Sequence, residues 1–467
     1  MLLAAGILGA QLFAPPRVGL ADNGDFLKVM DPAGLGYTTD VYEERYWQWT
    51  LPNFTIVEPG PFPGEYRTSE TLLAKAAVAG SRLLSSSRLF DIRAMGIVHS
   101  LLFLAFLGLL GVAVADLGLG ARLLALGLSV FCFTDVGYVA PFNSFYSQTA
   151  SLLFLLLTLA TAAIAIRRGK LDGWLLLAYF GFAALFVCSK PQESIQGPLL
   201  ALLGLRLSGV RGRGAWRRLA GVAAASLCAI SFWYYAVIPR RTISEVGLYH
   251  TVFMELLPAS REPGRDLSDL GLDPGLARFS GVTAYEKNTP LADPAFRAAF
   301  FARIGYGGVL RFYLARPGRF MQRLRLAGQR AFQLRPGNLA NFDRQSGFPP
   351  GTLSRRFDAW SAVRARLGGA GGLLWVVLLL AFNGVAAFRL LPRTERGRLV
   401  RDVLAIVSLM AAVEFLVCSL ADYLGDVSRH LYVLQAMCDL LLIADLVWLA
   451  QIVGGGASRV ASSPSSE

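Results

Sequence analysis

The chain alternates between long apolar runs and short polar loops, and two longer polar segments interrupt this pattern. Runs that approach the roughly 20 residues of a bilayer-crossing helix predict membrane spans. They lie at about 94–115, 121–141, 149–166, 173–188, 195–207, 217–238, 371–388, 400–420 and 431–453. The pattern therefore predicts an all-α polytopic membrane protein.

The apolar start of the chain, residues 1–14, adds one more helix. It is similar to the core of a signal peptide, but no basic residue precedes it. Pro15, Pro16 and Arg17 follow where a small-residue cleavage site would stand. We interpret the segment as an uncleaved first span that residues 18–20 could extend. This brings the prediction to about ten transmembrane helices.

The first long polar segment, 21–93, is rich in acidic residues, and its prolines and glycines indicate loops. Ser69 can cap an amphipathic helix, because apolar residues recur at helical spacing from there to Leu83. We expect such a helix, next to membrane spans, to lie along the membrane surface.

The second long polar segment, 239–370, is rich in arginine. Asp293 before Pro294 favours the start of one helix and Pro317 the start of a second, which predicts a small helical outer domain. The Gly- and Ser-rich end of the chain predicts a disordered tail. The predicted parts are an N-terminal membrane module at 1–238 that includes the loop 21–93, the outer segment at 239–370, C-terminal spans at 371–453 and the tail at 454–467.

Composition agrees with a membrane protein. The chain is 54% hydrophobic and 16% charged, whereas soluble proteins carry about a quarter charged residues. The net charge of +13 does not indicate a nucleic-acid partner, because the basic residues lie in short loops between apolar runs and in the segment 239–370. Cationic loops next to membrane lipids explain the first group. The five cysteines form no CxxC pair and predict neither zinc nor disulfides.

The basic residues also predict the orientation. One set of alternate loops is strongly basic, whereas the other set holds only Lys190 and Arg429. The basic set is cytoplasmic by the positive-inside rule, so both termini are cytoplasmic and both long polar segments face outward. The basic set contains Arg122, Arg167, Arg168, Lys170, Arg211, Arg213, Arg217, Arg218, Arg389, Arg393, Arg396 and Arg398.

Polar residues that could carry chemistry gather on the predicted outer face. Asp22 and Asp25 stand three residues apart behind the first helix. Two such carboxylates can act as a general base or hold a divalent cation, Mg²⁺ or Mn²⁺. The alternative is structural, because Asp-Asn-Gly-Asp is also an ordinary turn sequence.

Three cations stand at outer turns between spans: Lys190, Arg429 and His430. A lipid-linked phosphate would lie at this depth and would bind to such donors. The alternative is that they extend to the lipid headgroups. Further polar residues at these turns predict a pocket, formed by Asn143, Tyr146, Gln148, Gln192, Glu193 and Asp426.

Other polar residues fall inside the predicted spans. We expect His99 to be a hydrogen-bonded packing residue. Glu414, Asp439 and Asp445 could form a proton or ion pathway. We favour interhelical hydrogen bonds for them, because no basic partner is evident in the neighbouring sequence.

Several motifs together resemble a known family. They are Ala21-Asp22-Asn23-Gly24-Asp25-Phe26, Phe90-Asp91-Ile92-Arg93 with Val98-His99, Phe142-Asn143-Ser144-Phe145-Tyr146-Ser147-Gln148, Ser189-Lys190-Pro191-Gln192, Ala331-Phe332-Gln333-Leu334-Arg335-Pro336, Gly425-Asp426 and Arg429-His430-Leu431. In this order, over nearly the whole chain, they resemble the GT-C glycosyltransferases, which use polyprenyl-phosphate sugars. The chain is most similar to bacterial cell-surface glycan hexose transferases of the WsfD type.

The resemblance implies a reaction on the outer face of the cytoplasmic membrane. Asp22 or Asp25 would accept the proton of an acceptor hydroxyl that attacks the anomeric carbon with inversion. Arg429, His430 and Lys190 would stabilise the departing lipid phosphate. Related sequences often have Glu where this chain has Gln148, which gives the two aspartates more weight as the base. The partners would be a polyprenyl-phosphate sugar, a glycan acceptor and membrane lipids.

Two other functions fit part of the pattern. A polysaccharide polymerase or ligase would rely on the arginines of the segment 239–370 rather than on an aspartate base. A transporter or flippase of lipid-linked glycans would need discontinuous helices and a site near the middle of the bilayer. The gathering of polar residues at one face disfavours the transporter.

Overall fold

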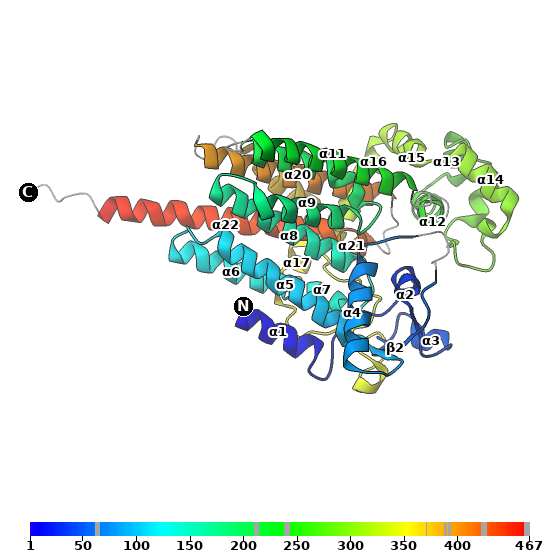
Figure 1. The fold of residues 1–467 in the computed structure, drawn as a ribbon. Helices are drawn as coiled ribbons and strands as arrows, with labels where there is room; N and C mark the ends of the chain where they lie inside the picture. The colour runs from blue at the N-terminus through cyan, green and yellow to red at the C-terminus, as the bar shows by residue number, and fades with distance from the viewer. Residues whose placement is uncertain are drawn as a thin grey trace, which may run out of the picture.

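The computed structural model describes residues 1–60, 66–209, 214–237, 243–369, 371–386, 390, 394–421 and 427–461. The protein is mostly helical. Its apolar helices lie side by side in a bundle, and the two long polar segments gather at one end of it (Figure 1). We call this end the polar end. The start of helix α1 and the end of helix α22 lie toward the other end, as predicted for termini that share one side.

Among the described residues, five helices are long and apolar enough to cross a membrane. They are α5 (Arg93–Ala113), α8 (Gln148–Arg168), α11 (Gly214–Val237), α20 (Glu395–Ala421) and α22 (Tyr432–Ala461). Helix α8 is the central one, because 83% of its apolar stretch is buried inside the protein, against 28–44% for the other four. The other four expose apolar side chains that only lipid can cover.

Two more of the predicted runs belong to bent pairs of helices. The first pair bends by 63°. Counting each pair as one span raises the number of candidate spans to seven. The pairs consist of α6 (Leu119–Phe133) with α7 (Val136–Val139) and the 3-10 helix η1 (Ala140–Asn143), and of α17 (Ala359–Gly369) with α18 (Gly372–Ala381) and the π-helix η7 (Phe382–Ala386).

The other predicted runs form shorter helices, namely α1 (Leu2–Leu12), α9 (Gly173–Val187) and α10 (Gly197–Ser208). The 11 residues of α1 extend about 17 Å at 1.5 Å per residue, whereas the hydrocarbon core is about 30 Å thick. The described residues therefore contain five to seven candidate spans, and the total of ten remains a prediction.

The end of the bundle opposite the polar end carries several of the arginines that were predicted to be cytoplasmic. Arg167 binds Asp116 at 2.8 Å, and Arg206 binds Asp402 at 2.6 Å, so ion pairs tie neighbouring helices together there. Four arginines of the predicted set, Arg211, Arg213, Arg389 and Arg393, lie outside the described residues.

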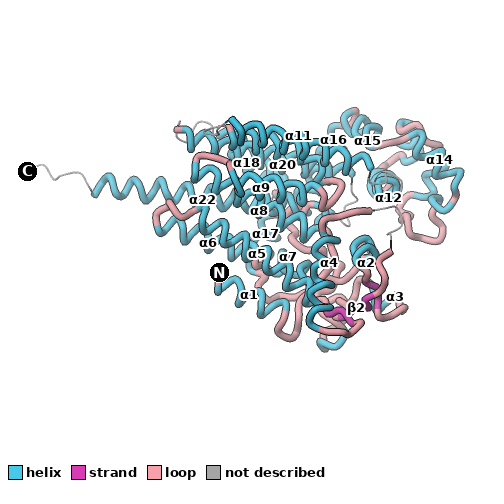
Figure 2. The backbone as a smooth tube through the Cα atoms, viewed as in Figure 1, coloured by secondary structure: helices cyan, strands magenta, loops and turns pink. Residues whose placement is uncertain are grey.

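The segment 21–93 contains a small antiparallel sheet, which corrects the all-α prediction (Figure 2). Its strands pair in the order β1, β2, β3. They are too short to be recognised from an alternation of polar and apolar residues. Phe54 and Phe90 face each other across two strands, and both rings pack against Phe145 just before α8. The sheet is thereby fixed to the bundle. The elements of this segment are α2 (Leu27–Ala33), β1 (Leu35–Tyr37), α3 (Tyr42–Arg45), β2 (Asn53–Ile56), α4 (Glu70–Leu84) and β3 (Leu89–Asp91).

Helix α4 begins where the sequence predicts, and it crosses the ends of the bundle helices in Figure 1, as expected for a surface helix. The predicted side-chain cap is wrong, because the Ser69 hydroxyl is buried without a hydrogen-bond partner among the described residues. The Thr68 hydroxyl instead accepts a hydrogen bond from the backbone N–H of Glu70 at 3.2 Å.

A buried Glu–His pair connects α4 to the bundle. Glu70 lies 2.8 Å from Nε2 of His99 and accepts a hydrogen bond from the backbone N–H of Ala150 at 2.9 Å. The other ring nitrogen of His99 donates to the carbonyl oxygen of Phe142 at 2.8 Å. His99 is thus a hydrogen-bonded packing residue, as predicted, and it joins α4, α5 and the start of α8.

The outer segment contains more helices than the two that were predicted. The predicted start at Asp293 is confirmed, because its side chain accepts a hydrogen bond from the backbone N–H of Ala295 at 2.9 Å. Arg323 attaches the segment to the bundle by donating to the carbonyl oxygen of Ser419 in α20 at 2.6 Å, and it pairs with Glu255 of the segment itself at 2.8 Å. Its elements are α12 (Ile243–His250), the π-helix η3 (Thr251–Leu256), α13 (Pro263–Asp269), η4 (Pro274–Phe279), η5 (Pro290–Ala292), α14 (Pro294–Arg303), α15 (Tyr306–Leu314), α16 (Pro317–Arg330) and η6 (Arg344–Ser346).

The acidic residues of the last two spans all hydrogen-bond to other elements, as predicted. Asp439 accepts hydrogen bonds from Tyr138 at 2.7 Å and from Trp360 at 2.9 Å. It also pairs with Arg364, a basic partner that the neighbouring sequence does not contain. Asp445 accepts a hydrogen bond from Asn383 at 2.9 Å. Arg364 was missed because it lies 75 residues away in the sequence.

The end of the chain was predicted to be a disordered tail at 454–467. The backbone of α22 is helical to Ala461. Residues 462–467 lie outside the described part of the chain. The tail therefore remains a prediction.

Candidate functional site

Four segments that are far apart in the sequence meet at the polar end. They are the loop behind α1, the start of α8, the turn between α9 and α10 with its 3-10 helix η2 (Glu193–Gln196), and the short helix α21 (Val427–His430). Each stands at an end of an apolar helix, which explains why polar side chains of all four reach the same level. Hydrogen bonds and ion pairs between these segments define the candidate site.

Asp22 is buried and stabilises its own loop. Its Oδ1 accepts hydrogen bonds from the backbone N–H groups of Gly24, at 2.7 Å, and Phe26, at 3.1 Å. Its Oδ2 accepts one from the hydroxyl of Tyr37. Burial raises the pKa of Asp22 to about 6, although these donors favour the charged form. Asp22 is 2% exposed and fully engaged, which favours the turn role that the sequence left as an alternative.

Asp25 has a different environment, because its side chain is partly exposed and faces two cations. Its Oδ1 pairs with Lys28 of α2, and its Oδ2 pairs with Arg429 of α21. Burial alone would raise the pKa of Asp25. The Lys28 ammonium and the Arg429 guanidinium outweigh this effect and hold that pKa well below its usual value. Asp25 is therefore ionised at neutral pH.

Tyr146 connects the first loop to α21. Its hydroxyl accepts a hydrogen bond from the backbone N–H of Asn23 at 3.0 Å and donates one to the carbonyl oxygen of Ala21 at 2.8 Å. The guanidinium of Arg429 lies over the Tyr146 ring, 5.1 Å from its centre. A cation over an aromatic face is attracted to it, so Tyr146 helps to position Arg429.

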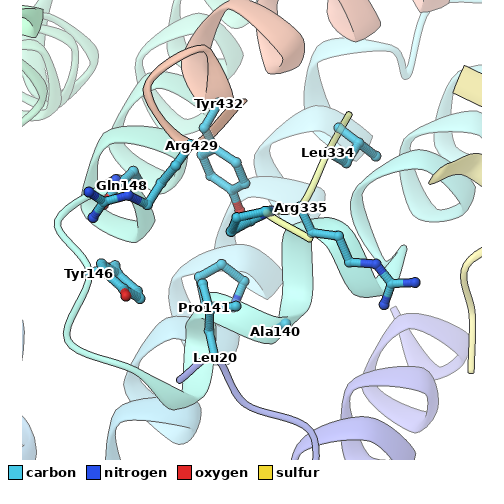
Figure 3. Close-up of a pocket in the computed structure, with 11 residues that line it drawn as sticks. Leu20, Ala140, Pro141, Tyr146, Gln148, Leu334, Arg335, Arg429 and Tyr432 are labelled. Atoms are coloured by element: carbon cyan, nitrogen blue, oxygen red, sulfur yellow. The ribbon is translucent and has the colours of Figure 1, made fainter. Parts of the chain in front are cut away.

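A narrow cavity lies next to this pair (Figure 3). Tyr146, Gln148 and Arg429 line it together with Arg335, and its other walls are mostly apolar. Arg335 stands across the cavity from Tyr146 and Gln148, and its guanidinium points away from them. The remaining lining residues are Leu20, Gly137, Ala140, Pro141, Leu334, Pro336 and Tyr432.

Lys190 is buried at the turn between α9 and α10. Its ammonium group makes no hydrogen bond or ion pair with any residue that the structure describes, and the longer-range attraction of Glu193 and Glu414 balances its charge. Glu193 is also fully buried, and neither of its carboxylate oxygens has a hydrogen-bond partner within the described ranges. Burial, and then the nearby Glu414, raise the pKa of Glu193 well above its usual value.

Gln192 joins this turn to α21. Its amide nitrogen donates to the carbonyl oxygen of His430 at 3.1 Å and also to Glu414. Its amide oxygen lies 3.3 Å from Nδ1 of the His430 ring. The turn that carries Lys190 and the helix that carries Arg429 and His430 are therefore held side by side.

The structure brings together most of the predicted site residues, with two exceptions. Asn143 does not line the cavity. Its amide donates to the carbonyl oxygens of Leu12, at 3.0 Å, and Val18, at 2.8 Å, and so fixes the end of α1. Asp426 lies outside the described residues.

Sequence reasoning missed three residues of the site. Lys28, in the first turn of α2, pairs with Asp25, which stands three residues before it in the sequence. Charges at this spacing meet in a helical turn. This spacing was the available signal. Tyr66 lies below Lys28, with its ring centre 5.7 Å from the ammonium nitrogen. No local pattern in the sequence indicates Tyr66 or Arg335.

Asp22 and Asp25 do not fit a shared divalent cation. The oxygens of Asp22 accept hydrogen bonds from its own loop and from Tyr37, and those of Asp25 each face a cation. In the described part of the chain, no three His, Cys, Asp or Glu side chains form a group that could hold a metal ion.

Comparison with known proteins gives one match. The family described as the YfdI N-terminal transmembrane domain matches residues 1–460. No curated protein matches the chain, and no solved structure matches it. With its apolar helices and a match over almost its whole length, the chain is a multi-pass membrane protein that belongs to the family of the YfdI N-terminal transmembrane domain.

Proposed function

We propose that this protein is a membrane glycosyltransferase of the GT-C type. It transfers a sugar, a hexose, from a polyprenyl-phosphate donor to a cell-surface glycan or lipid-linked acceptor on the outer face of the cytoplasmic membrane. The proposal includes the ten spans and the outward orientation expected from the sequence. The observation that carries it is the meeting of Asp25 and Arg429, 404 residues apart in the chain, at the polar end of the bundle.

Arg429 and Lys190 bind the phosphate of the donor in this mechanism. Arg429 is 7% exposed and held over Tyr146, so its guanidinium is already positioned. Lys190 is a buried cation without a hydrogen-bonded partner among the described residues. A phosphate oxygen would supply one. His430 adds a third group on the same side through its contact with Gln192.

The transfer itself is an inverting displacement. The oxygen of the acceptor hydroxyl forms a bond to the anomeric carbon, and the bond from that carbon to the phosphate oxygen breaks. The electron pair stays on the phosphate, whose growing charge Arg429 and Lys190 stabilise. The hydroxyl proton passes to Asp25, which is partly exposed and ionised. Asp22 keeps the loop in place through Tyr37 and the backbone of Gly24.

The direct test is a transfer assay with purified protein. The protein is incubated with polyprenyl-phosphate hexoses and glycan acceptors, and mass spectrometry detects an acceptor heavier by one hexose together with free polyprenyl phosphate. We expect transfer by the wild type and none by Asp25→Asn. A folded preparation that transfers sugar from no polyprenyl-phosphate donor would contradict the proposal.

A transporter or flippase of lipid-linked glycans is the second candidate, because bent helices now give it a structural argument. The pair α6–α7 bends by 63°, and broken helices often line transport sites. Glu414 and Asp439, within the spans, would then carry the function. Neutralising both in a reconstituted flipping assay separates the candidates, since a transporter would lose flipping whereas Asp25→Asn would leave it unchanged.

The polymerase or ligase alternative loses support from the pairing of the outer arginines. Arg316 pairs with Asp269, and Arg323 pairs with Glu255 at 2.8 Å. Arg319 pairs with Asp266. Arginines that hold the outer segment together are less available to bind a substrate.

A further inference from the structure

The carboxylate of Asp25 occupies a position that is built for an anion. Each of its two oxygens faces one cation, Lys28 on one side and Arg429 on the other. The two cations come from elements at opposite ends of the chain, α2 and α21. The carboxylate between them offers one oxygen to each cation. A phosphate can offer two of its oxygens to two donors in the same way.

Both cations rest on aromatic rings. Lys28 lies over Tyr66, 5.7 Å from the ring centre, and Arg429 lies over Tyr146 at 5.1 Å. Tyr66 and Tyr146 are both buried. The rings support the two cations from below. The side chains of Lys28 and Asp25 are similarly exposed, at 25% and 27%, but Lys28 belongs to α2 whereas Asp25 belongs to the loop before it.

The charges around Asp25 are unbalanced. The groups that face it are Lys28, Arg429, the Tyr66 hydroxyl and, from its own loop, the buried Asp22. At the neighbouring turn stands one more cation, Lys190, whose charge attracts Glu193 and Glu414. A polyprenyl-phosphate sugar brings one negative charge, and the polyprenyl phosphate that is left after transfer brings nearly two. An anion of this kind suits the cations better than one carboxylate does.

We propose that Lys28 is a further phosphate-binding residue, and that Asp25 holds the place of the donor phosphate until the donor arrives. The phosphate then binds Lys28 and Arg429 and displaces Asp25 from them. The freed carboxylate accepts the proton of the acceptor hydroxyl. This inference rests on the proposed function and adds to it an order of events, in which donor binding prepares the base.

The order has a physical reason. While Lys28 and Arg429 hold Asp25, its pKa is low, so it accepts protons poorly. Loss of both contacts to the phosphate returns that pKa toward its usual value and strengthens the base. An acceptor that enters first, without a donor, therefore meets a weak base.

Binding of the product analogue tests the inference without any turnover. We would measure the Kd of a short-chain polyprenyl phosphate for the purified protein in detergent. If Asp25 competes with the phosphate, Asp25→Asn binds it more tightly, by about tenfold, whereas Lys28→Met binds it about tenfold more weakly. Lys28→Arg keeps a cation at this position and stays near the wild type.

The control is Asp91→Asn, which removes an equally charged group from a partly exposed ion pair with Arg93 in the same polar segment. Its Kd should not change. Weaker or unchanged binding by Asp25→Asn, or unchanged binding by Lys28→Met, would overturn the inference while leaving the proposed function standing. A wild-type protein that binds no polyprenyl phosphate would overturn the proposed function as well.

Discussion

Two Asp–Arg pairs in this protein show how similar charges can have different roles. Asp439 and Arg364 pair inside the bundle, where both are at most 5% exposed, and Asp439 accepts two more hydrogen bonds from Tyr138 and Trp360. Asp25 and Arg429 pair at the polar end, where the Asp25 side chain is 27% exposed and faces a second cation. The first pair is enclosed by protein, and the second is open to a ligand.

Under the proposed mechanism, burial and satisfied partners distinguish a structural charge from a functional one better than sequence position does. A buried pair with additional hydrogen bonds holds helices in register, and removal of one member leaves an uncompensated charge. The Asp25–Arg429 pair is partly exposed through Asp25, and the ammonium of Lys190 has no ion pair among the described residues. Such a cluster can still bind a charged substrate. The following predictions test this contrast.

The largest expected effect is on stability at the enclosed pair. Asp439→Asn leaves the buried Arg364 without its counter-charge, so we expect a loss of about 3–5 kcal/mol in the free energy of unfolding. Thermal unfolding in detergent and the yield of monodisperse protein measure it. Asp445→Asn is the matched control, since among the described residues Asp445 has an amide partner, Asn383, and no ion pair. Equal melting temperatures for the two variants would contradict a structural role for the enclosed pair.

At the open pair, the expected effect is on activity. Arg429→Met should lower the rate of transfer by about 100- to 1,000-fold, because a preorganised donor to the developing phosphate charge is lost. The melting temperature should stay within a few degrees of the wild type. Arg429→Lys should recover only part of the rate, since lysine cannot bind a phosphate through two parallel N–H groups. A fully active Arg429→Met would remove this residue from the mechanism.

Asp22 predicts a pH effect on stability. Its pKa is raised to about 6 in the folded protein, above the usual 3.8, so the folded state holds its proton more tightly than the unfolded state. The stability from this proton is present below about pH 4 and is lost as the pH rises to about 6. It amounts to at most about 3 kcal/mol, since one pKa unit corresponds to 1.36 kcal/mol.

Asp22→Asn keeps an acceptor oxygen but does not titrate. Its melting temperature relative to the wild type should therefore rise between pH 4 and pH 6 and stay constant above. The lowered pKa of Asp25 acts in the opposite direction and below pH 4, so it does not obscure this range. A difference that is independent of pH would show that Asp22 is not shifted.

The smallest expected effect is a gain in stability from Lys190→Met. Lys190 is a buried cation that forms no ion pair within the described ranges, which costs free energy, so its replacement by an apolar side chain of similar length should stabilise the protein by about 1 kcal/mol. The same variant should bind the donor more weakly, which appears as a raised KM. A loss of stability would mean that Lys190 is structural.

The sequence predicted the membrane class, several boundaries of the helices and most of the site. Long apolar runs identified α5, α8, α11, α20 and α22, because a span is a local property of some 20 residues. The site residues Asp25, Gln192, Arg429 and His430 were found because ends of apolar helices must meet at the membrane edge. In the structure, Asp25 contacts Arg429 and Gln192 contacts His430.

What the sequence missed depends on contacts between distant segments. The strands β1 to β3 are three or four residues long and exist because Phe54 and Phe90 pack on Phe145. Asn143 was assigned to the pocket because it is polar and near Tyr146, but its amide fixes the end of α1. Asp22 and Asp25 looked equivalent in the sequence, and only Tyr37, Lys28 and Arg429 distinguish them.

The most direct test of this account is a single transfer assay with three proteins in one membrane-mimetic preparation: the wild type, Asp25→Asn and Asp22→Asn. Each is supplied with the same polyprenyl-phosphate hexose and acceptor, and the sugar transferred per folded molecule is measured by mass spectrometry. The account predicts transfer by the wild type, transfer near that level by Asp22→Asn, and almost none by Asp25→Asn. Full transfer by Asp25→Asn, or its loss in folded Asp22→Asn alone, would contradict it.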